Sequence, residues 1–117
     1  MRKSFEERPI AMNSTEELYT ELLSLLKRVG TFKTEHKKES IHIVHGRAFV
    51  GIHPKKSYLG VNIVLEKGEI PLKADKVEQV SSHRFHHFFK ITSKRQMNKP
   101  FVRLLHEAYH LTNPKEK

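Results

Sequence analysis

The sequence of 117 residues contains no cysteine. Without thiols the chain can have no disulfide framework, no thiolate zinc site and no cysteine nucleophile. The absence of cysteine also fits a reducing compartment. Internal repeats and low-complexity segments are absent as well, so neither a solenoid nor a linker-like chain is indicated.

Long apolar runs are also missing, and none approaches the roughly 20 residues that a membrane-spanning helix needs. The N-terminus begins with basic residues, but no apolar core follows them, so it does not resemble a secretory signal. We therefore expect a cytoplasmic protein that does not interact with a membrane. Residues 1–13 are predicted to form a flexible arm, 14–112 a single domain and 113–117 a disordered tail.

Acidic side chains are scarce in one part of the chain. The net charge is +9, and the 28 residues from 79 to 106 hold six Lys or Arg and no Asp or Glu. Residues 31–58 hold six basic and two acidic side chains, whereas the remaining segments are close to neutral. Two separate segments thus carry the excess charge. If they meet in the fold, they form one basic face that attracts polyanions.

The apolar residues are 37% of the chain and are clustered, which predicts a folded domain. Ser14 and Glu17 form a capping box, and leucines then recur at helical spacing until Gly30, which predicts a first helix. Strands are predicted at residues 41–45, 48–52, 58–65 and 85–92, and the polar segment 66–79 is predicted to be a long connection. A last helix is expected near Pro100, with Asn98 or Ser93 as its cap.

This order of elements predicts an α+β fold with two layers. An antiparallel sheet of about four strands would carry the N- and C-terminal helices on one face, and the other face would be open and more polar. Alternation along residues 58–65 places Leu59, Val61, Ile63 and Leu65 on the covered face. Tyr58, Gly60, Asn62 and Val64 would lie on the opposite face.

The chain from Glu17 to Leu111 resembles the bacterial domain-of-unknown-function family 5655. The resemblance rests on several short pieces in a fixed order: Leu18-Tyr19 through Val29-Gly30, Ile41-His42-Ile43, Phe49 to Lys56 with Leu59-Gly60-Val61, His87 to Ser93, and Leu105 to Tyr109. It implies a compact α+β fold. Some members resemble appendages of predicted restriction-type nucleases, which favours nucleic acid as a partner. The resemblance implies no catalytic residues.

The basic segments supply candidate contacts to phosphate groups. One aromatic side chain joins them, because Phe88 is predicted to lie on the open face with His86 and Lys90, where it could stack on a base. The opposite interpretation is an ordinary solvated surface, with aromatic residues in the core. The candidate nucleic-acid-binding residues are Lys37, Lys38, Arg47, Lys55, Lys56, Arg84, Phe88, Lys90, Lys94 and Arg95.

Nine histidines raise the question of a metal site. His83 and His87 would share a strand face but stand about 13 Å apart, and His106 and His110 have a workable spacing without a metalloprotease motif. We predict no metal site and no cofactor. Carboxylates are sparse where the basic residues gather, and no glycine-rich phosphate loop is present, so no catalytic residue is predicted either.

Three functions follow from the residues. The first is a non-enzymatic accessory module that binds nucleic acid or another polyanion through a basic face. The second is a protein-interaction module, such as a homodimer, which would cover apolar residues on both sides of the strands. The third is an enzyme or a binder of small anions that uses a basic cleft. The sequence favours the first.

Overall fold

The computed structural model describes residues 14–112, and the predicted arm 1–13 and tail 113–117 lie outside the described residues. The chain begins with helix α1 (Thr15–Val29), continues through strands β1 (Lys33–His36), β2 (Ile41–His45), β3 (Arg47–Pro54), β4 (Leu59–Leu65), β5 (Lys76–Ser81) and β6 (Arg84–Ile91), and ends with the short 3₁₀ helix η1 (Lys94–Gln96) and helix α2 (Lys99–Thr112). The α+β class is confirmed.

All six strands belong to one antiparallel sheet with the order β1-β2-β3-β4-β6-β5. The expectation of about four strands was therefore wrong. Strands β1 and β5 are the edges of the sheet, and every residue in both is exposed, so neither shows the apolar alternation by which a strand is detected in a sequence. Part of the predicted connection 66–79 is thus β5, which pairs with β6.

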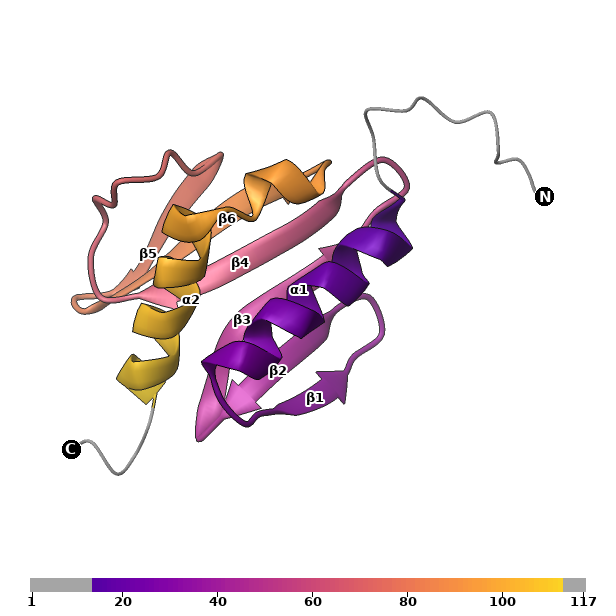
Figure 1. Ribbon diagram of the computed structural model, residues 1–117. Coiled ribbons are helices and arrows are strands. Elements are labelled where there is room, and N and C mark those ends of the chain that lie inside the picture. The colour runs from indigo at the N-terminus through magenta and orange to yellow at the C-terminus, as the bar shows by residue number, and fades with distance from the viewer. Residues whose placement is uncertain (1–13, 113–117) are drawn as a thin grey trace.

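Both helices pack on the same face of the sheet, as Figure 1 shows. Both contact β4 and each other, and α2 also contacts β3. The apolar stripe predicted for α1 supplies four buried leucines, and Val29 packs beside them. From α2 come the buried Phe101, Leu104, Leu105 and Ala108. We call the side of the sheet beneath the helices the covered face and the other side the open face.

The predicted alternation of β4 is confirmed. Leu59, Val61, Ile63 and Leu65 are buried under the helices, and the residues between them are only partly buried. The partners of these residues in β6 are Ile91, Phe89, His87 and Phe85, which therefore share the covered face. His87 is fully buried there, and its Nε2 donates a hydrogen bond to the Lys67 carbonyl oxygen at 2.7 Å.

The helix caps predicted from the sequence are present in the structure. Ser14 and Glu17 form the reciprocal capping box of α1, with both hydrogen bonds present. Asn98 caps α2, because its Oδ1 accepts from the Phe101 backbone N–H at 3.3 Å. Gly46 joins β2 to β3 with a φ of 83°, which a residue with a side chain rarely adopts. These features fix where the helices and the hairpin begin and end.

Candidate nucleic-acid interface

The open face is built from alternate residues of the central strands. Strand register places Gly51, Asn62, Phe88 and Lys76 side by side in one row across β3, β4, β6 and β5. The next row is formed by His53, Gly60 and Lys90. No helix covers these rows (Figure 1), so their side chains meet solvent. The predicted placement of Phe88, His86 and Lys90 on this face is confirmed.

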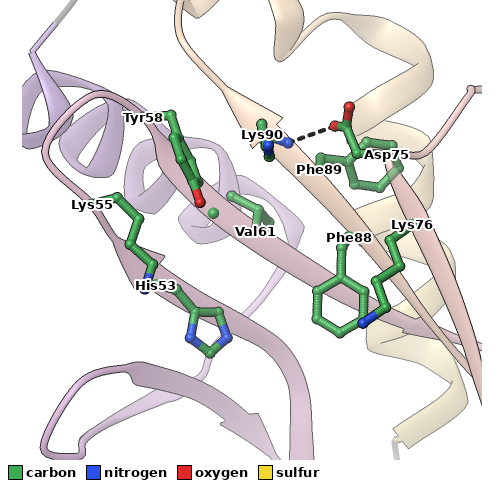
Figure 2. Close-up of a pocket in the computed structure, with 10 residues that line it drawn as sticks. His53, Lys55, Tyr58, Val61, Asp75, Lys76, Phe88, Phe89 and Lys90 are labelled. Carbon is green, nitrogen blue, oxygen red and sulfur yellow. Dashed lines mark hydrogen bonds between the residues drawn. The ribbon is translucent and has the colours of Figure 1, made fainter.

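A cavity of about 420 Å³ opens on this face, within the usual range for small-molecule sites. We call it the Tyr58–Phe88 pocket. Figure 2 shows Tyr58 and Lys55 on one side of β4, and Phe88 with Lys76 on the other. The residues around it are His53, Lys55, Tyr58, Gly60, Val61, Asp75, Lys76, Phe88, Phe89 and Lys90.

Two lysines of this pocket lie over aromatic rings. The Lys90 Nζ is 5.3 Å from the centroid of Tyr58, and the Lys76 Nζ is 5.6 Å from the centroid of Phe88. Such cation–π contacts are weak at exposed sites, at about 0.5–1 kcal/mol. They hold the two ammonium groups beside the aromatic rings while leaving them available to an anion.

Backbone contacts fix Phe88 and Lys90 from the side of β5. The Asp75 carboxylate accepts a hydrogen bond from the Lys90 backbone N–H at 2.8 Å (Figure 2), and the Asp75 N–H donates to the Phe88 carbonyl oxygen at 2.8 Å. Beyond the strand, Gln96 Nε2 donates to the Lys90 carbonyl oxygen at 2.9 Å. Asp75 therefore acts as an extension of the strand ladder as well as a negative charge on the open face.

A second, smaller cavity of about 240 Å³ lies on the same face. We call it the Asn62 pocket. Its lining includes two arginines and two histidines but no Phe or Tyr: His42, Arg47, Ala48, Val50, Gly51, Asn62, Val64, Arg84 and His86. Asn62 Nδ2 donates to His86 Nδ1 at 3.2 Å, and Asn62 Oδ1 is buried with no partner among the described residues. This oxygen is a free acceptor.

Two histidines of the open face have lowered pKa values. For His53 the main cause is burial, and the charge of Lys55 and the neighbouring His42 add to it. For His86 burial again leads, Arg84 and His87 add to it, and Glu78 opposes them. Both imidazoles are therefore neutral near pH 7, and the positive charge of the face at that pH comes from Lys and Arg.

The sequence-predicted residues divide into three groups. Arg47, Arg84, Phe88, Lys90 and Lys55 line the two pockets of the open face, and Lys56 lies beside Lys55 in the turn between β3 and β4. Lys37 and Lys38 lie in the turn between β1 and β2, where Lys37 pairs with Glu35 at 3.6 Å. Lys94 and Arg95 belong to η1, and Lys94 lines a separate hollow with Glu16, Glu17 and Glu21 of α1.

Two residues of the candidate interface were not predicted from the sequence. Lys76 was missed because β5 has no apolar alternation and because its segment carries more acidic than basic side chains. His53 falls just outside the predicted strand 48–52, whereas it is part of β3 and lies opposite Gly60. Only the cross-strand register brings these two side chains to Phe88 and Lys90.

The described part of the chain has neither a cluster of metal ligands nor a membrane-spanning helix. Among residues 14–112, no three His, Asp or Glu side chains converge as metal ligands. No helix in this range is long and apolar enough to cross a membrane.

Comparison with known proteins identifies the family. The family model described as Domain of unknown function (DUF5655) matches residues 5–112, nearly the whole chain, and the protein therefore belongs to that family. Comparisons with curated proteins and with solved structures gave no match.

Proposed function

We propose that this DUF5655 domain is a non-enzymatic accessory module that binds nucleic acid, or a polyanion of the same kind, through its open face. The observation that supports the proposal most is the convergence of cations from separate strands on one uncovered surface. These cations are Arg47, Lys55, Lys76, Arg84 and Lys90, and none forms an ion pair with another residue in the range 14–112. Unpaired cations on one face attract a phosphate backbone.

The two charged segments of the sequence contribute to this face together. Arg47 and Lys55 come from residues 31–58, and Arg84 and Lys90 come from 79–106. They line two pockets that share strands β3, β4 and β6. The helical layer is different, because α1 carries Glu16, Glu17 and Glu21, which lie close to Lys94. A polyanion is therefore expected to favour the open face over the helical face.

Salt dependence tests the proposal. The triple variant Lys76→Gln, Arg84→Gln and Lys90→Gln removes three cations from the open face. For a single strand, the slope of log K against log salt should become shallower by about 2 when three phosphate contacts are lost. Fluorescence anisotropy with labelled oligonucleotides over a salt series measures this slope.

The matched control removes the same charge from the helical layer. Lys27→Gln, Lys99→Gln and Arg103→Gln lower the net charge equally but alter only exposed residues of α1 and α2. This control should retain the wild-type slope. If both triple variants weaken binding equally, net charge alone is responsible and the open face is not the site. Absence of binding by the wild-type protein at low salt would overturn the proposal.

A second candidate function is self-association through β5, which corresponds to the interaction-module hypothesis. This strand is a sheet edge, and it carries both of the large apolar residues that are most exposed in the described range, Val77 at 44% and Val80 at 47%. An unpaired edge can pair with the same strand of a second copy. Light scattering of the wild type and of Val77→Lys tests this function, and a monomer at all concentrations would rule it out.

A further inference from the structure

We propose that the Tyr58–Phe88 pocket receives one unpaired base of a single-stranded nucleic acid, while the Asn62 pocket holds the neighbouring phosphates. This inference rests on the proposed function and adds to it the strandedness of the ligand and the division of work between the two pockets.

The floor of the Tyr58–Phe88 pocket includes Gly60, which has no side chain to fill the cavity. Gly60 lies at its centre, and a Cβ added there would stand 3.2 Å from the His53 carbonyl oxygen and 3.7 Å from Tyr58 Cε1. Tyr58 is two residues before Gly60 on the same face, and Phe88 lies opposite Asn62, two residues after it. The backbone positions of the two aromatic residues are thus about 13 Å apart along the strand direction, with the glycine between them.

The aromatic residues of the pocket can stack on a base, and its lysines can contact the phosphate of that base. Aromatic rings stack on any base because every base has a π-face, so this contact needs no particular sequence. Phe88 and Tyr58 are both half-buried, so each is held by the sheet while part of its ring still faces the cavity. Lys76 and Lys90 lie over the two rings, so a base that stacks on a ring displaces the ammonium group, which can then pair with the phosphate of that base.

The Asn62 pocket offers the complementary chemistry. It contains Arg47 and Arg84, which can bind phosphate, and it has no Phe or Tyr ring. Asn62 lies opposite Phe88, at the border between the pockets, and its Nδ2 is hydrogen-bonded to His86 Nδ1. The aromatic and cationic functions are therefore separated along one face.

This arrangement favours a single strand over a duplex. In a duplex the bases are stacked and paired inside the helix, so a base reaches an aromatic ring only after it is extruded, which costs free energy. The described elements of the open face are strands, and the helices α1 and α2, which might enter a groove, lie on the other side of the sheet (Figure 1). A single strand can present its bases to the pocket without this cost.

An abasic strand provides the sharpest test. We would measure the affinity of the wild-type protein for a twelve-residue oligo(dA), the equivalent oligo(A), a duplex of the same length, and an abasic phosphodiester with the same charge. Removal of the bases should weaken binding about ten-fold or more, since stacking of one base contributes about that factor. Both oligo(dA) and oligo(A) should bind more tightly than the duplex.

The outcomes separate the two proposals. If the abasic strand binds as tightly as oligo(dA), the base pocket is wrong, although the polyanion-binding function stands. If neither binds at low salt, the proposed function itself is overturned, and this inference with it. Tighter binding of the duplex would also contradict the inference.

Variants locate the base. Phe88→Leu should weaken binding of oligo(dA) several-fold and leave binding of the abasic strand nearly unchanged, because it removes the ring and its weak contact with Lys76 but no charge. The same substitution at Phe85, on the covered face of the same strand, is the matched control and should change neither affinity. Fluorescence of 2-aminopurine within the strand should be quenched by the wild type and less so by Phe88→Leu. Equal quenching by both proteins would contradict the assignment.

Gly60→Val provides a second route if Phe88→Leu does not fold. Valine suits a strand, but its methyl groups fill the floor of the pocket. The affinity for oligo(dA) should fall to that for the abasic strand. Retention of the difference between these two ligands in a folded Gly60→Val protein would overturn the proposal.

Discussion

The two faces of strands β4 and β6 differ in burial and in the polar groups that they carry. On the covered face Val61, Ile63 and Phe89 are almost fully buried. On the open face Gly60, Asn62 and Lys90 are adjacent residues in the same strands, yet they surround cavities. Because successive side chains of a strand point to opposite faces, one set of residues can stabilise the fold while the next set forms a surface.

The two faces also differ in the polar groups that they carry. Among the described residues, the covered face has one fully buried polar side chain, His87, whose Nε2 donates to a carbonyl oxygen while its Nδ1 has no partner. The open face keeps unpaired cations and a free amide oxygen. The buried Asn62 oxygen costs stability because it has no partner, whereas the solvated cations at the edge of a cavity can pair with a ligand. The open face is therefore where binding free energy is available.

The largest expected effect is the difference in stability loss between alanine variants of two neighbouring phenylalanines, one on each face. Phe89→Ala should lower the free energy of unfolding by about 3–5 kcal/mol, since Phe89 is 6% exposed and packs edge-on against Phe101 at 5.7 Å. Phe88→Ala should cost about 1 kcal/mol, because its ring is only partly buried on the open face. Urea denaturation measures both. Equal losses would mean that the two faces do not divide stability from binding.

A smaller effect is expected where the two helices meet. Gly30 ends α1 against the ring of Tyr109, and a Cβ at residue 30 would lie 2.5 Å from Tyr109 Cζ. Gly30→Ala should therefore destabilise the protein by about 1–3 kcal/mol through overpacking. Gly51→Ala on the open face is the control, because its Cβ meets Asn62 Nδ2 at an ordinary 3.4 Å. Thermal unfolding that shows no difference between them would contradict this assignment.

The smallest effect is a dependence on pH that has opposite signs for folding and binding. The lowered pKa values of His53 and His86 mean that the unfolded chain, with ordinary values near 6.5, takes up protons first as the pH falls. The contribution of these histidines to stability is therefore present above pH 6.5 and is lost as the pH falls towards their lowered values. Urea denaturation at pH 7.5, 6.0 and 5.0 measures this loss.

Binding should respond in the other direction. Protonated His53 and His86 add positive charge to the open face, so the affinity for an oligonucleotide should rise over the same pH range. Replacement of both histidines by glutamine should flatten both profiles. A wild-type affinity that stays constant from pH 7.5 to 5.0 would mean that neither imidazole lies near a bound phosphate.

The sequence predicted those elements that have an apolar period. The leucine pattern was enough to predict α1 and the alternation was enough to predict β4, because each of these elements buries one side. The capping box of Ser14 and the cap from Asn98 were also visible as local motifs. The two edge strands were not predicted, because β1 and β5 bury no side chain and leave no period to detect.

The candidate site was predictable only in part. Alternation alone placed Phe88 and Lys90 on the open face, and the charge distribution identified Arg47, Arg84 and Lys55. Lys76 and His53 join them through strand register, which depends on pairings between distant segments. Lys94 was predicted to belong to the site because it lies in the same basic segment as Lys90. In the structure it lies near glutamates of α1. A charge pattern does not reveal which charges are compensated.

Tyr109 has a consequence for the order in which the chain folds. Its hydroxyl donates to the Thr31 carbonyl oxygen at 3.0 Å, and its ring stacks on His45 at 4.1 Å and meets Phe49 edge-on at 5.4 Å. One side chain near the end of α2 thus joins the exit of α1 to the β2–β3 hairpin across 78 residues of sequence. During synthesis the helix and the hairpins can form locally, but this junction closes only after residue 109 has emerged. Until then the end of α1 and the side of the hairpin that Tyr109 covers remain accessible to chaperones and proteases.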